Sequence, residues 1–575
     1  MTMDAAALAG IVFDVRQWTG ARVDRVFQPS ASEVHLSLRR PGQAQRLCLG
    51  LRPDLPRLHF TAARPENPAH PPAFCMGLRK WLEGARLLRV EYPPWERWVG
   101  LHFAGRSSLG DEVELGLYAE LIPGATNLVL VRLPNRQVLA ALKPGTTSYQ
   151  PPPPLSGPLP GQVSEEALAA GLQGEGPAWQ CILGTVRGFG PVLAREAVYR
   201  AGFDPGAPPR LVEPARLTRA VGGIAAEVAA GQFWPAAYCD GQGRPRLWHV
   251  LKLAHLPGHV AEAAETASAA ADRFYTAHLE EAAFRSRLSA LQGALASARK
   301  RLERKRLAQA ADLQRAGAAG DFRLWAELLT AYADRVPPGT ATASLPNYYL
   351  PGSPEVSIPL DPALNARANA RVYFDRHAKA ERTRRAATKE LERTGAELEY
   401  LERVSETVEA CRTVQDLGEV WEELGAAGFI RNPPGPAGTR APKPDFTGLE
   451  LVSSRGDRIM VGKNHRQNEQ LVRVARPDDV WLHARGVPGA HVLLRPGSDQ
   501  GREWPSRESL EEAAELAAHF SRAGKARWVE VDWTRARHVR RPRDARPGQV
   551  IYDHQQTVRV SSVPRLFPSR NPPAG

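Results

Sequence analysis

Apolar and polar residues alternate in short runs through the first part of the chain. The segments "GARVDRVFQPSASEVHLSLRR" (20–40) and "VELGLYAELIPGATNLVLVRL" (113–133) show this period of two, which is typical of β-strands. Between them, "PPAFCMGLRKWLEGARLLRVE" (71–91) has helical spacing and begins with proline. The pattern predicts a first block of mixed α and β structure, which the proline-rich stretch 149–162 closes.

Helical periodicity dominates two later segments, at about 261–313 and 365–423, which contain almost no Gly or Pro. Apolar residues step by three and four in both, as in a heptad seam. The seam residues are Phe284, Leu288, Leu291, Leu295, Ala298 and Leu302, then Leu391, Leu398, Leu401 and Val408. We expect an antiparallel coiled-coil arm about 75 Å long, with a small folded tip formed by the insert between the segments. A coiled coil that serves only for dimerisation is the alternative.

A glycine-containing turn separates two short helical patterns in "CILGTVRGFGPVLAREAVYRAG" (181–202). Gly188 and Gly190 precede a helix start, where exposed backbone N–H groups suit a phosphate. This pattern predicts a helix-hairpin-helix. An ordinary helix–helix corner fits the same residues.

The last block begins after the proline-rich stretch 431–446 and combines strand patterns with the helical segment "SRESLEEAAELAAHFSRAG" (506–524). Ser509 and Glu512 match a capping box, which predicts that the helix starts just after Ser509. His483 and His491 flank a Pro-Gly turn that we expect to join two strands. We expect His483 to be structural and His491 to lie at the surface.

Charge and composition point to nucleic acid. The chain of 575 residues, long enough for about three or four domains, has a net charge of +13 and a pI near 9.7, mostly from arginine. Six arginines lie between Trp533 and Arg546. Arginine binds phosphate and stacks on bases, although a GC-rich genome would also raise its share.

Several functional classes are disfavoured. No apolar run reaches the length of a membrane span, and the first residues do not resemble a secretion signal. The five cysteines form no C-x-x-C pair, and no P-loop or Ser-His-Asp pattern stands out. We therefore expect a cytoplasmic protein with no metal and no cofactor.

Long motifs in the last block resemble a known family. The strings 461–495 and 531–560, with "EAAELAAHFSRA" between them, are very similar to the RNA-binding NFACT-R domain of the NFACT family of ribosome quality-control factors. Segments 20–39 and 64–87 resemble the NFACT-N domain, and "NYYLPGSPEVSIPLDP" (347–362) resembles the tip of the family's coiled-coil arm.

The resemblance implies a multidomain α+β fold with a defined order of parts. These parts are a glycosylase-like NFACT-N domain (1–175), a helix-hairpin-helix region (176–255), a coiled-coil arm with tip insert (256–430), a Pro-rich linker (431–445), an α/β NFACT-R domain (446–565) and a tail (566–575).

The resemblance also implies a function. Family members bind large ribosomal subunits, through rRNA and stalk-base proteins, when peptidyl-tRNA obstructs them. They recruit alanyl-tRNA and direct the addition of C-terminal alanine tails that mark stalled chains for degradation. The ribosome performs the peptidyl transfer, so this chain is expected to be an RNA-binding factor, a monomer on the ribosome, and no enzyme. A small S4-like RNA-binding protein is a candidate accessory partner.

Site residues follow from the matched motifs. The family's Asp-Arg pair for tRNA matches Glu96 and Arg97 in "PPWERW", for which a plain surface ion pair is the alternative. A second tRNA-binding segment matches "ELIPGATN", where Glu120 and Asn127 are kept but the family's Gly, Arg and His are replaced by 123–125. The implied RNA-binding residues of NFACT-R are Lys463, Asn464, His491, Arg535, Arg537, His538, Arg540 and Arg541.

Three other functions compete with alanine tailing. A ribosome-binding sensor without tailing would fit the altered 123–125 segment. A fibronectin-binding surface adhesin is disfavoured by the basic pI and the expected absence of a signal. A DNA glycosylase would need an N-terminal Pro-Glu, where this chain has Met-Thr-Met-Asp.

Overall fold

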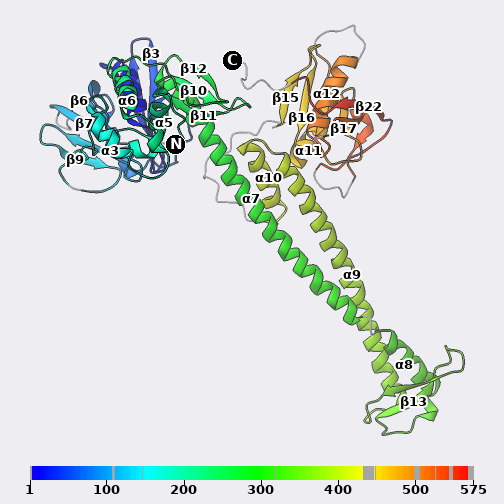
Figure 1. Ribbon diagram of the computed structural model, residues 1–575. Coiled ribbons are helices and arrows are strands. Elements are labelled where there is room, and N and C mark those ends of the chain that lie inside the picture. Colours follow the sequence, from blue (N-terminus) through cyan, green and yellow to red (C-terminus); the bar gives the residue numbers. More distant parts are fainter. Residues whose placement is uncertain are drawn as a thin grey trace. The chain divides into compact units, whose positions relative to one another are not determined.

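The computed structural model describes residues 3–106, 110–145, 147–316, 319–430, 446, 448–497, 505–524, 526–542 and 548–566. Two compact units are present, unit 1 built on Met1–Ala282 and unit 2 on the residues from Ala283 (Figure 1). The predicted linker 431–445 and residues 567–575 of the predicted tail (566–575) lie outside the described residues.

A nine-stranded sheet in the order β4-β3-β2-β1-β5-β6-β7-β8-β9 forms the body of unit 1. All neighbouring strands are antiparallel. The strands are β1 (Arg22–Ser30), β2 (Glu33–Arg40), β3 (Gln43–Arg52), β4 (Leu55–Thr61), β5 (Arg86–Glu91), β6 (Trp98–Arg106), β7 (Glu112–Glu120), β8 (Asn127–Arg132) and β9 (Gln137–Ala141). The predicted strand segments 20–40 and 113–133 are confirmed.

Helices and a small second sheet complete unit 1. The helices are α1 (Ala5–Arg16), α2 (Ala73–Leu82), α3 (Glu165–Gly171), α4 (Ala178–Leu183), α5 (Pro191–Arg200), α6 (Pro214–Ala229) and two 3₁₀ turns, η1 (Pro160–Gln162) and η2 (Pro209–Leu211). The second sheet has the order β11-β10-β12, with β10 (Ala236–Cys239), β11 (Pro245–His249) and β12 (Val260–Ala263). One hydrophobic core joins Leu36 of the large sheet, Leu193 of α5 and Tyr275 of α7 (Ala267–Ala316). The predicted NFACT-N and hairpin regions therefore share a core.

In unit 2, the part of α7 that follows Ala282 and the long helix α9 (Ala366–Ala410) run side by side in opposite directions (Figure 1). Leu291, Leu295 and Leu302 of α7 pack with Leu401 and Val408 of α9 in one cluster. Every predicted seam residue except Leu391 belongs to this cluster. The coiled-coil geometry itself stays a prediction.

The insert between these helices folds as a small tip. It contains α8 (Ala319–Ala331), η3 (Ala333–Arg335) and a hairpin of β13 (Thr342–Pro346) and β14 (Glu355–Pro359). Leu328, Leu345 and Ile358 form its core with Tyr373 of α9.

The second predicted helical segment, 365–423, is not one helix. The chain leaves α9 after Ala410 and starts α10 (Val414–Ala426). Thr413 and Asp416 form a capping box that begins α10, because each side chain accepts the other's backbone N–H.

The last block forms a six-stranded antiparallel sheet in the order β15-β16-β18-β17-β19-β22. Its elements are β15 (Leu449–Val452), β16 (Arg458–Gly462), α11 (His465–Val474), β17 (Val480–Ala484), β18 (His491–Arg495), α12 (Arg507–His519), β19 (Trp528–Arg535), η4 (Ala536–His538) and β22 (Gln556–Ser561), with a separate pair β20 (Val539–Arg540) and β21 (Ile551–Tyr552). Alternate strand residues face α12 on one side and α11 on the other. The strand pairing across the Pro-Gly turn is confirmed, whereas α11 was not predicted.

The predicted start of the helix at 506–524 is wrong by one turn. Ser506 is the N-cap of α12, and its side chain accepts the N–H of Ser509. Ser509 lies inside the helix, fully buried, and its hydroxyl donates to Asp457 at 2.6 Å. Ser509 therefore fixes α12 to the β15–β16 turn instead of starting the helix.

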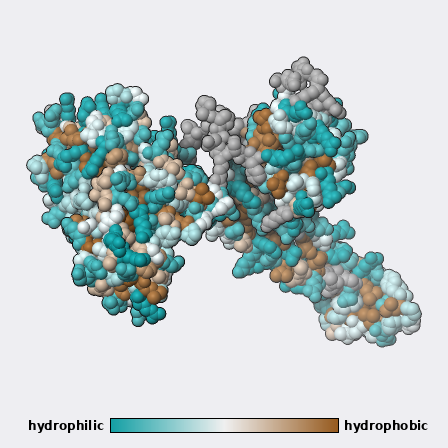
Figure 2. Space-filling model, turned by 45° about the horizontal axis from the view of Figure 1, so that its top comes forward, coloured by the Kyte–Doolittle hydropathy of each residue, from teal (hydrophilic) through white to brown (hydrophobic). Residues whose placement is uncertain are grey.

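Hydrophilic side chains cover much of the face seen in Figure 2, with hydrophobic patches between them. Among the described residues, no helix combines the length and the apolar character that a bilayer crossing requires.

Candidate RNA-binding sites

Three predicted tRNA-binding residues meet at one end of the large sheet. Arg97 directly precedes β6, and its carbonyl accepts the N–H of Leu121 at 2.8 Å. Glu120 ends β7 and lies opposite Asn127, the first residue of β8. Arg97, Glu120 and Asn127 are therefore neighbours because adjacent antiparallel strands begin and end there.

The predicted phosphate-binding turn reaches the same place. Gly188 has φ +74°, and a Cβ on it would lie 2.5 Å from the carbonyl oxygen of Trp95, so only glycine fits. Gly190 is the N-cap of α5. A Cβ at Gly190 would lie 3.7 Å from Nη2 of Arg97, which places this guanidinium beside the start of α5. A cation and a helix N-terminus together suit a phosphate.

Asp4 lies behind this pair. Its carboxylate is buried, accepts the N–H of Ala7 at 2.9 Å and lies 3.3 Å from Nε2 of His249. Burial alone would raise the pKa of Asp4, but His249, the Ala7 N–H and Arg97 together lower it. Asp4 is therefore an anion that balances the charge of Arg97. The Nε atom of Arg97 is buried without a hydrogen-bond partner.

The alternative of a surface ion pair between Glu96 and Arg97 is wrong, and so is a surface position for Glu96. Glu96 is 6% exposed and accepts the N–H of Leu155 at 3.1 Å. Its nearest cation is Arg187, at 3.9 Å. Burial raises the pKa of Glu96. The carboxylate points inward, where it contacts both Leu155 of the proline-rich stretch and Arg187 of the turn that precedes α5.

Glu120 and Asn127 also have partners within the chain. Glu120 accepts the hydroxyl proton of Tyr149 at 3.1 Å, and burial raises the pKa of Glu120. The side-chain oxygen of Asn127 accepts the N–H groups of Leu128 and Lys143 at 2.9 and 3.0 Å. These contacts shape the sheet end, so Arg97 is the predicted residue best suited to bind a ligand there.

Exposed arginines follow β19 in unit 2. The side chains of Arg537, Arg540 and Arg541 are 53%, 67% and 46% exposed. Each pairs with a carboxylate, namely Asp478, Asp553 and Glu469 respectively. Such exposed pairs contribute little to stability, so a phosphate can replace the carboxylate at small cost.

The other two predicted RNA-binding residues in the segment 535–541 are less exposed. Arg535 donates to the carbonyl of Asp478 at 2.8 Å. His538 is half-buried, with its ring centroid 4.6 Å from that of His554. Arg543 and Arg546, the last of the six arginines, lie outside the described residues.

Lys463 and Asn464 contact α10, which carries acidic residues on this side. Lys463 Nζ lies 2.9 Å from Asp416 Oδ1, and Asn464 Nδ2 lies 2.7 Å from Glu419 Oε2. Arg466 continues the row with Glu422 at 2.7 Å. The two predicted RNA ligands are thus engaged within unit 2, where they dock the sheet domain on α10.

Two family models cover the chain. The model for the NFACT N-terminal and middle domains matches residues 4–439, and the model for the NFACT protein RNA binding domain matches residues 446–554. The Rqc2 homolog RqcH of Bacillus subtilis (strain 168) is 32% identical, over 98% of each chain. The chain belongs to the NFACT family.

Other proteins similar to this NFACT chain include the Rqc2 homolog RqcH of Streptococcus pneumoniae (strain D39), which is 28% identical over 98% of each chain. A solved structure, the fibrinogen binding protein from Staphylococcus aureus, is 21% identical with a TM-score of 0.40. It covers 48% of this chain and 99% of its own.

The prediction for the two histidines of the NFACT RNA-binding domain is wrong for His491. His491 is only 4% exposed, and its N–H donates to Asn468 of α11. Its ring packs edge-on against Trp481 and His483, with centroids 5.1 and 5.3 Å apart. Because His491 opens β18 beneath α11, its side chain is enclosed by the sheet and that helix, so it cannot contact RNA there.

Lys463 allows a test of the docking on α10. We expect Lys463→Gln to speed amide hydrogen exchange in α10 by roughly tenfold or more, because a hydrogen bond to a charged group contributes about 1.5–3 kcal/mol. Arg466→Gln, which removes a more exposed partner of the same helix, should have a smaller effect. Unchanged exchange in Lys463→Gln, measured by mass spectrometry, would contradict the docking role.

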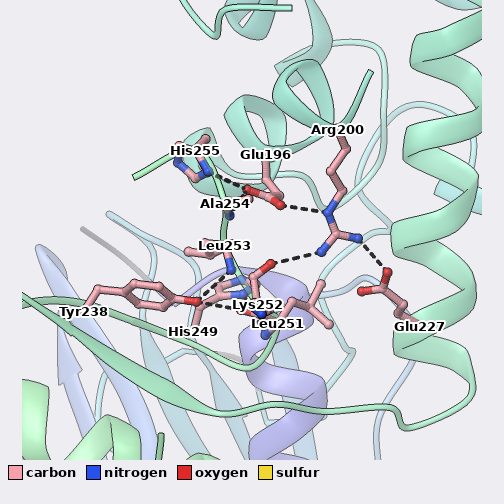
Figure 3. Close-up of polar contacts among 10 residues, drawn as sticks. All are labelled: Glu196, Arg200, Glu227, Tyr238, His249, Leu251, Lys252, Leu253, Ala254 and His255. Carbon is pink, nitrogen blue, oxygen red and sulfur yellow. Dashed lines mark hydrogen bonds and ion pairs between the residues drawn. The ribbon is translucent and has the colours of Figure 1, made fainter. Parts of the chain in front are cut away.

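A buried network that the sequence did not reveal holds α5 in place. Figure 3 shows the carboxylate of Glu196 between Arg200 and His255. Glu196 lies 2.8 Å from Arg200 Nε and 2.7 Å from His255 Nδ1, and it accepts the N–H of Ala254 at 2.9 Å. Arg200 also donates to Glu227 of α6 at 2.6 Å.

The neighbouring contacts extend to the Arg97 site. The hydroxyl of Tyr238 accepts the N–H of Leu253 and donates to the carbonyl of Leu251. The N–H of Leu251 donates to Nδ1 of His249, so the neutral imidazole carries its proton on Nε2 and donates it to Asp4. The same loop, 249–255, therefore fixes both α5 and Asp4.

One group of described side chains has the spacing of a metal site. The ligand atoms of Glu33, His35 and Cys48 lie within 4.8 Å of one another. Arg57 donates to Glu33 in this cluster and already supplies a positive charge. Burial raises the pKa of Cys48 to about 12, so its thiol keeps its proton. These features favour a closed polar cluster over a cation site.

Proposed function

We propose that this NFACT protein is a cytoplasmic, ribosome-associated quality control factor. It binds large ribosomal subunits obstructed by peptidyl-tRNA, through rRNA and stalk-base proteins, and recruits alanyl-tRNA for the addition of C-terminal alanine tails. The proposal rests on the match to RqcH relatives along almost the whole chain. The ribosome performs the peptidyl transfer, and the chain acts as a non-enzymatic RNA-binding factor.

The geometry of unit 1 supports a tRNA site. Arg97 and the N-terminus of α5 converge at the sheet end, where one phosphate can accept from both. Asp4, whose carboxylate accepts from His249, adds a buried negative charge near this guanidinium. In unit 2, Arg537, Arg540 and Arg541 provide exposed cations for rRNA or tRNA phosphates.

A ribosome-binding sensor without tailing is the second candidate function. The turn after β7 has Gly124 and Ala125 where the family pattern places Arg and His. The Ala125 N–H donates to the carbonyl of Ile122, so the turn itself is well formed. It offers no cationic side chain at these two positions, which motivates this alternative.

Affinity purification after ribosome stalling, with sequencing of the bound tRNA, separates these functions. Large subunits with enriched alanine tRNA would support tailing. Large subunits without a second tRNA would support the sensor, and the absence of ribosomes would refute both.

Arg97 provides the sharpest variant for this test. We expect Arg97→Ala to lower bound tRNA by roughly tenfold, because a charge-assisted contact contributes about 1.5–3 kcal/mol. The slope of log affinity for tRNA against log salt concentration should become shallower by the amount that about one phosphate contact contributes. Arg39→Ala removes the same charge from an exposed pair on β2 and should leave tRNA binding unchanged. Equal tRNA recovery in Arg97→Ala and the parent would contradict the assignment.

A further inference from the structure

One part of the sheet in unit 2 exposes a tryptophan. Along β19 and β22, Val529, Val531 and Val560 pack in the core beneath α12. The alternate residues of the same strands lie on the opposite face. Trp528 is among them and is 50% exposed.

The neighbours of Trp528 on this face are charged. Glu530 lies two residues further along β19 and pairs in register with Arg559 of β22. Arg559 also lies over the indole, with Cζ 5.8 Å from the ring centroid. Arg485 donates to the carboxylate of Glu530 at 3.4 Å from the other side. One aromatic ring, two arginines and one glutamate therefore share an open face.

This combination matches the chemistry of an unpaired RNA base and its phosphates. A base stacks on an exposed indole or against a guanidinium, the arginines attract adjacent phosphates, and a carboxylate accepts a base amino group. We propose that Trp528, with Arg559 and Arg485, is a stacking platform for an unpaired base of single-stranded RNA. This inference rests on the proposed RNA-binding function and names the surface that recognises a base.

Single-stranded RNA fits better than a duplex. Inside a helix both faces of each base are already stacked, so a protein ring meets bases at loops, bulges and ends. A protein partner would also cover an exposed tryptophan. The flanking arginines favour RNA, because they add phosphate ligands to the aromatic surface.

The second tryptophan of β19 faces the other way. Trp533 is five residues from Trp528 on β19, and an odd spacing places two strand residues on opposite faces. Trp533 packs against the core beneath α12. The arginine-rich segment after Trp533 is therefore adjacent in sequence to a core residue, while the exposed ring lies at the start of the strand.

Binding of the full-length chain to a short single-stranded RNA that contains 2-aminopurine tests the platform. We expect Trp528→Ala to lower the affinity by about tenfold or more and to abolish the stacking change in 2-aminopurine fluorescence. Trp528→Phe should retain most of both signals, because its ring also stacks. Arg559→Gln should make the slope of log affinity for RNA against log salt concentration shallower by the amount that about one phosphate contact contributes.

Arg507→Gln is the matched control, because it removes an exposed arginine from α12 on the other face of the sheet. Wild-type affinity and fluorescence in Trp528→Ala, with the fold intact by circular dichroism, would overturn the platform. The platform would also be overturned if Trp528→Ala kept its affinity for RNA and lost only the binding of a protein in pull-downs. If the parent chain itself binds no RNA, the proposed function fails, and this result is distinct from failure of the platform.

Discussion

Replacing Glu196 with alanine should destabilise unit 1 by about 3–5 kcal/mol, because it removes the buried partner of an ion pair and the acceptor of backbone N–H groups. Glu196 has no exposed surface. Burial alone would raise its pKa, but His255 and Arg200 lower it, so the group is an anion in the folded protein. Its removal takes one of two carboxylate partners from Arg200 and leaves two backbone N–H groups of the 249–255 loop without their acceptor.

Thermal unfolding followed by circular dichroism measures this effect. We expect a fall in Tm on the order of 10 °C for Glu196→Ala. Glu227→Gln is the matched control, because Glu227 contacts the same arginine but its side chain is 36% exposed. It should cost less than about 1 kcal/mol. Equal Tm values for the parent and Glu196→Ala would show that the network does not support α5.

Glu196→Ala should also weaken tRNA binding more than its loss of stability alone explains. The N-terminus of α5 lies beside Arg97, and Glu196 fixes the second turn of that helix. A shift of α5 would separate the two groups that we assign to one phosphate. Filter binding below the Tm of the variant, compared with Arg97→Ala, separates this displacement from unfolding.

Strands and long helices could be predicted because their patterns are local. The alternation at 20–40 and 113–133 gave strands, since every second residue must face the core. The steps of three and four in 284–302 gave a helix face that packs on α9. The break after Ala410 was missed because Thr413 and Asp416 cap a new helix without any proline or glycine.

Binding sites combine residues from segments that are far apart in the sequence. A pattern along the chain does not show which of these segments meet in space. The motifs around Arg97 and Gly190 were both recognised, but nothing in the sequence shows that the two residues lie side by side. Glu196 lies in a helical stretch where a glutamate normally faces solvent, and only the 249–255 loop buries it. His491 was placed at the surface because α11, which covers it, was not predicted.

Three histidines, His491 buried and His465 and His483 half-buried, make unit 2 sensitive to acid. Burial lowers the pKa of His465 and of His483 to about 4, and lowers that of His491 well below 6.5. Arg403 adds to the effect on His465, while Asp532 opposes it at His483. Glu423 of α10 lies 3.6 Å from His465, and burial raises the pKa of its carboxyl. These imidazoles are therefore neutral in the folded protein at neutral pH.

The free energy of unfolding of unit 2 should fall by several kcal/mol as the pH drops from about 6.5 to about 4. In that window the unfolded chain binds protons on its histidines, whose ordinary pKa is about 6.5, while the folded chain does not. Each unit of pKa shift corresponds to about 1.4 kcal/mol. Glu423 offsets part of the loss, because the folded protein takes up a proton there first. Below about pH 4 the contribution of His465 and His483 should level off.

Urea unfolding of the full chain at pH 7.5, 6, 5 and 4.5, followed by tryptophan fluorescence, gives this dependence. His465→Gln should flatten the slope, because its amide keeps a polar side chain beside Glu423 and does not titrate. His483→Gln should do the same, and the double variant should flatten it further, since the two rings have different charged neighbours. A slope that is unchanged in all three variants would mean that other groups cause the acid sensitivity. A flattened slope would show that the interior of the RNA-binding domain, and with it the docking of Lys463 on α10, depends on neutral imidazoles.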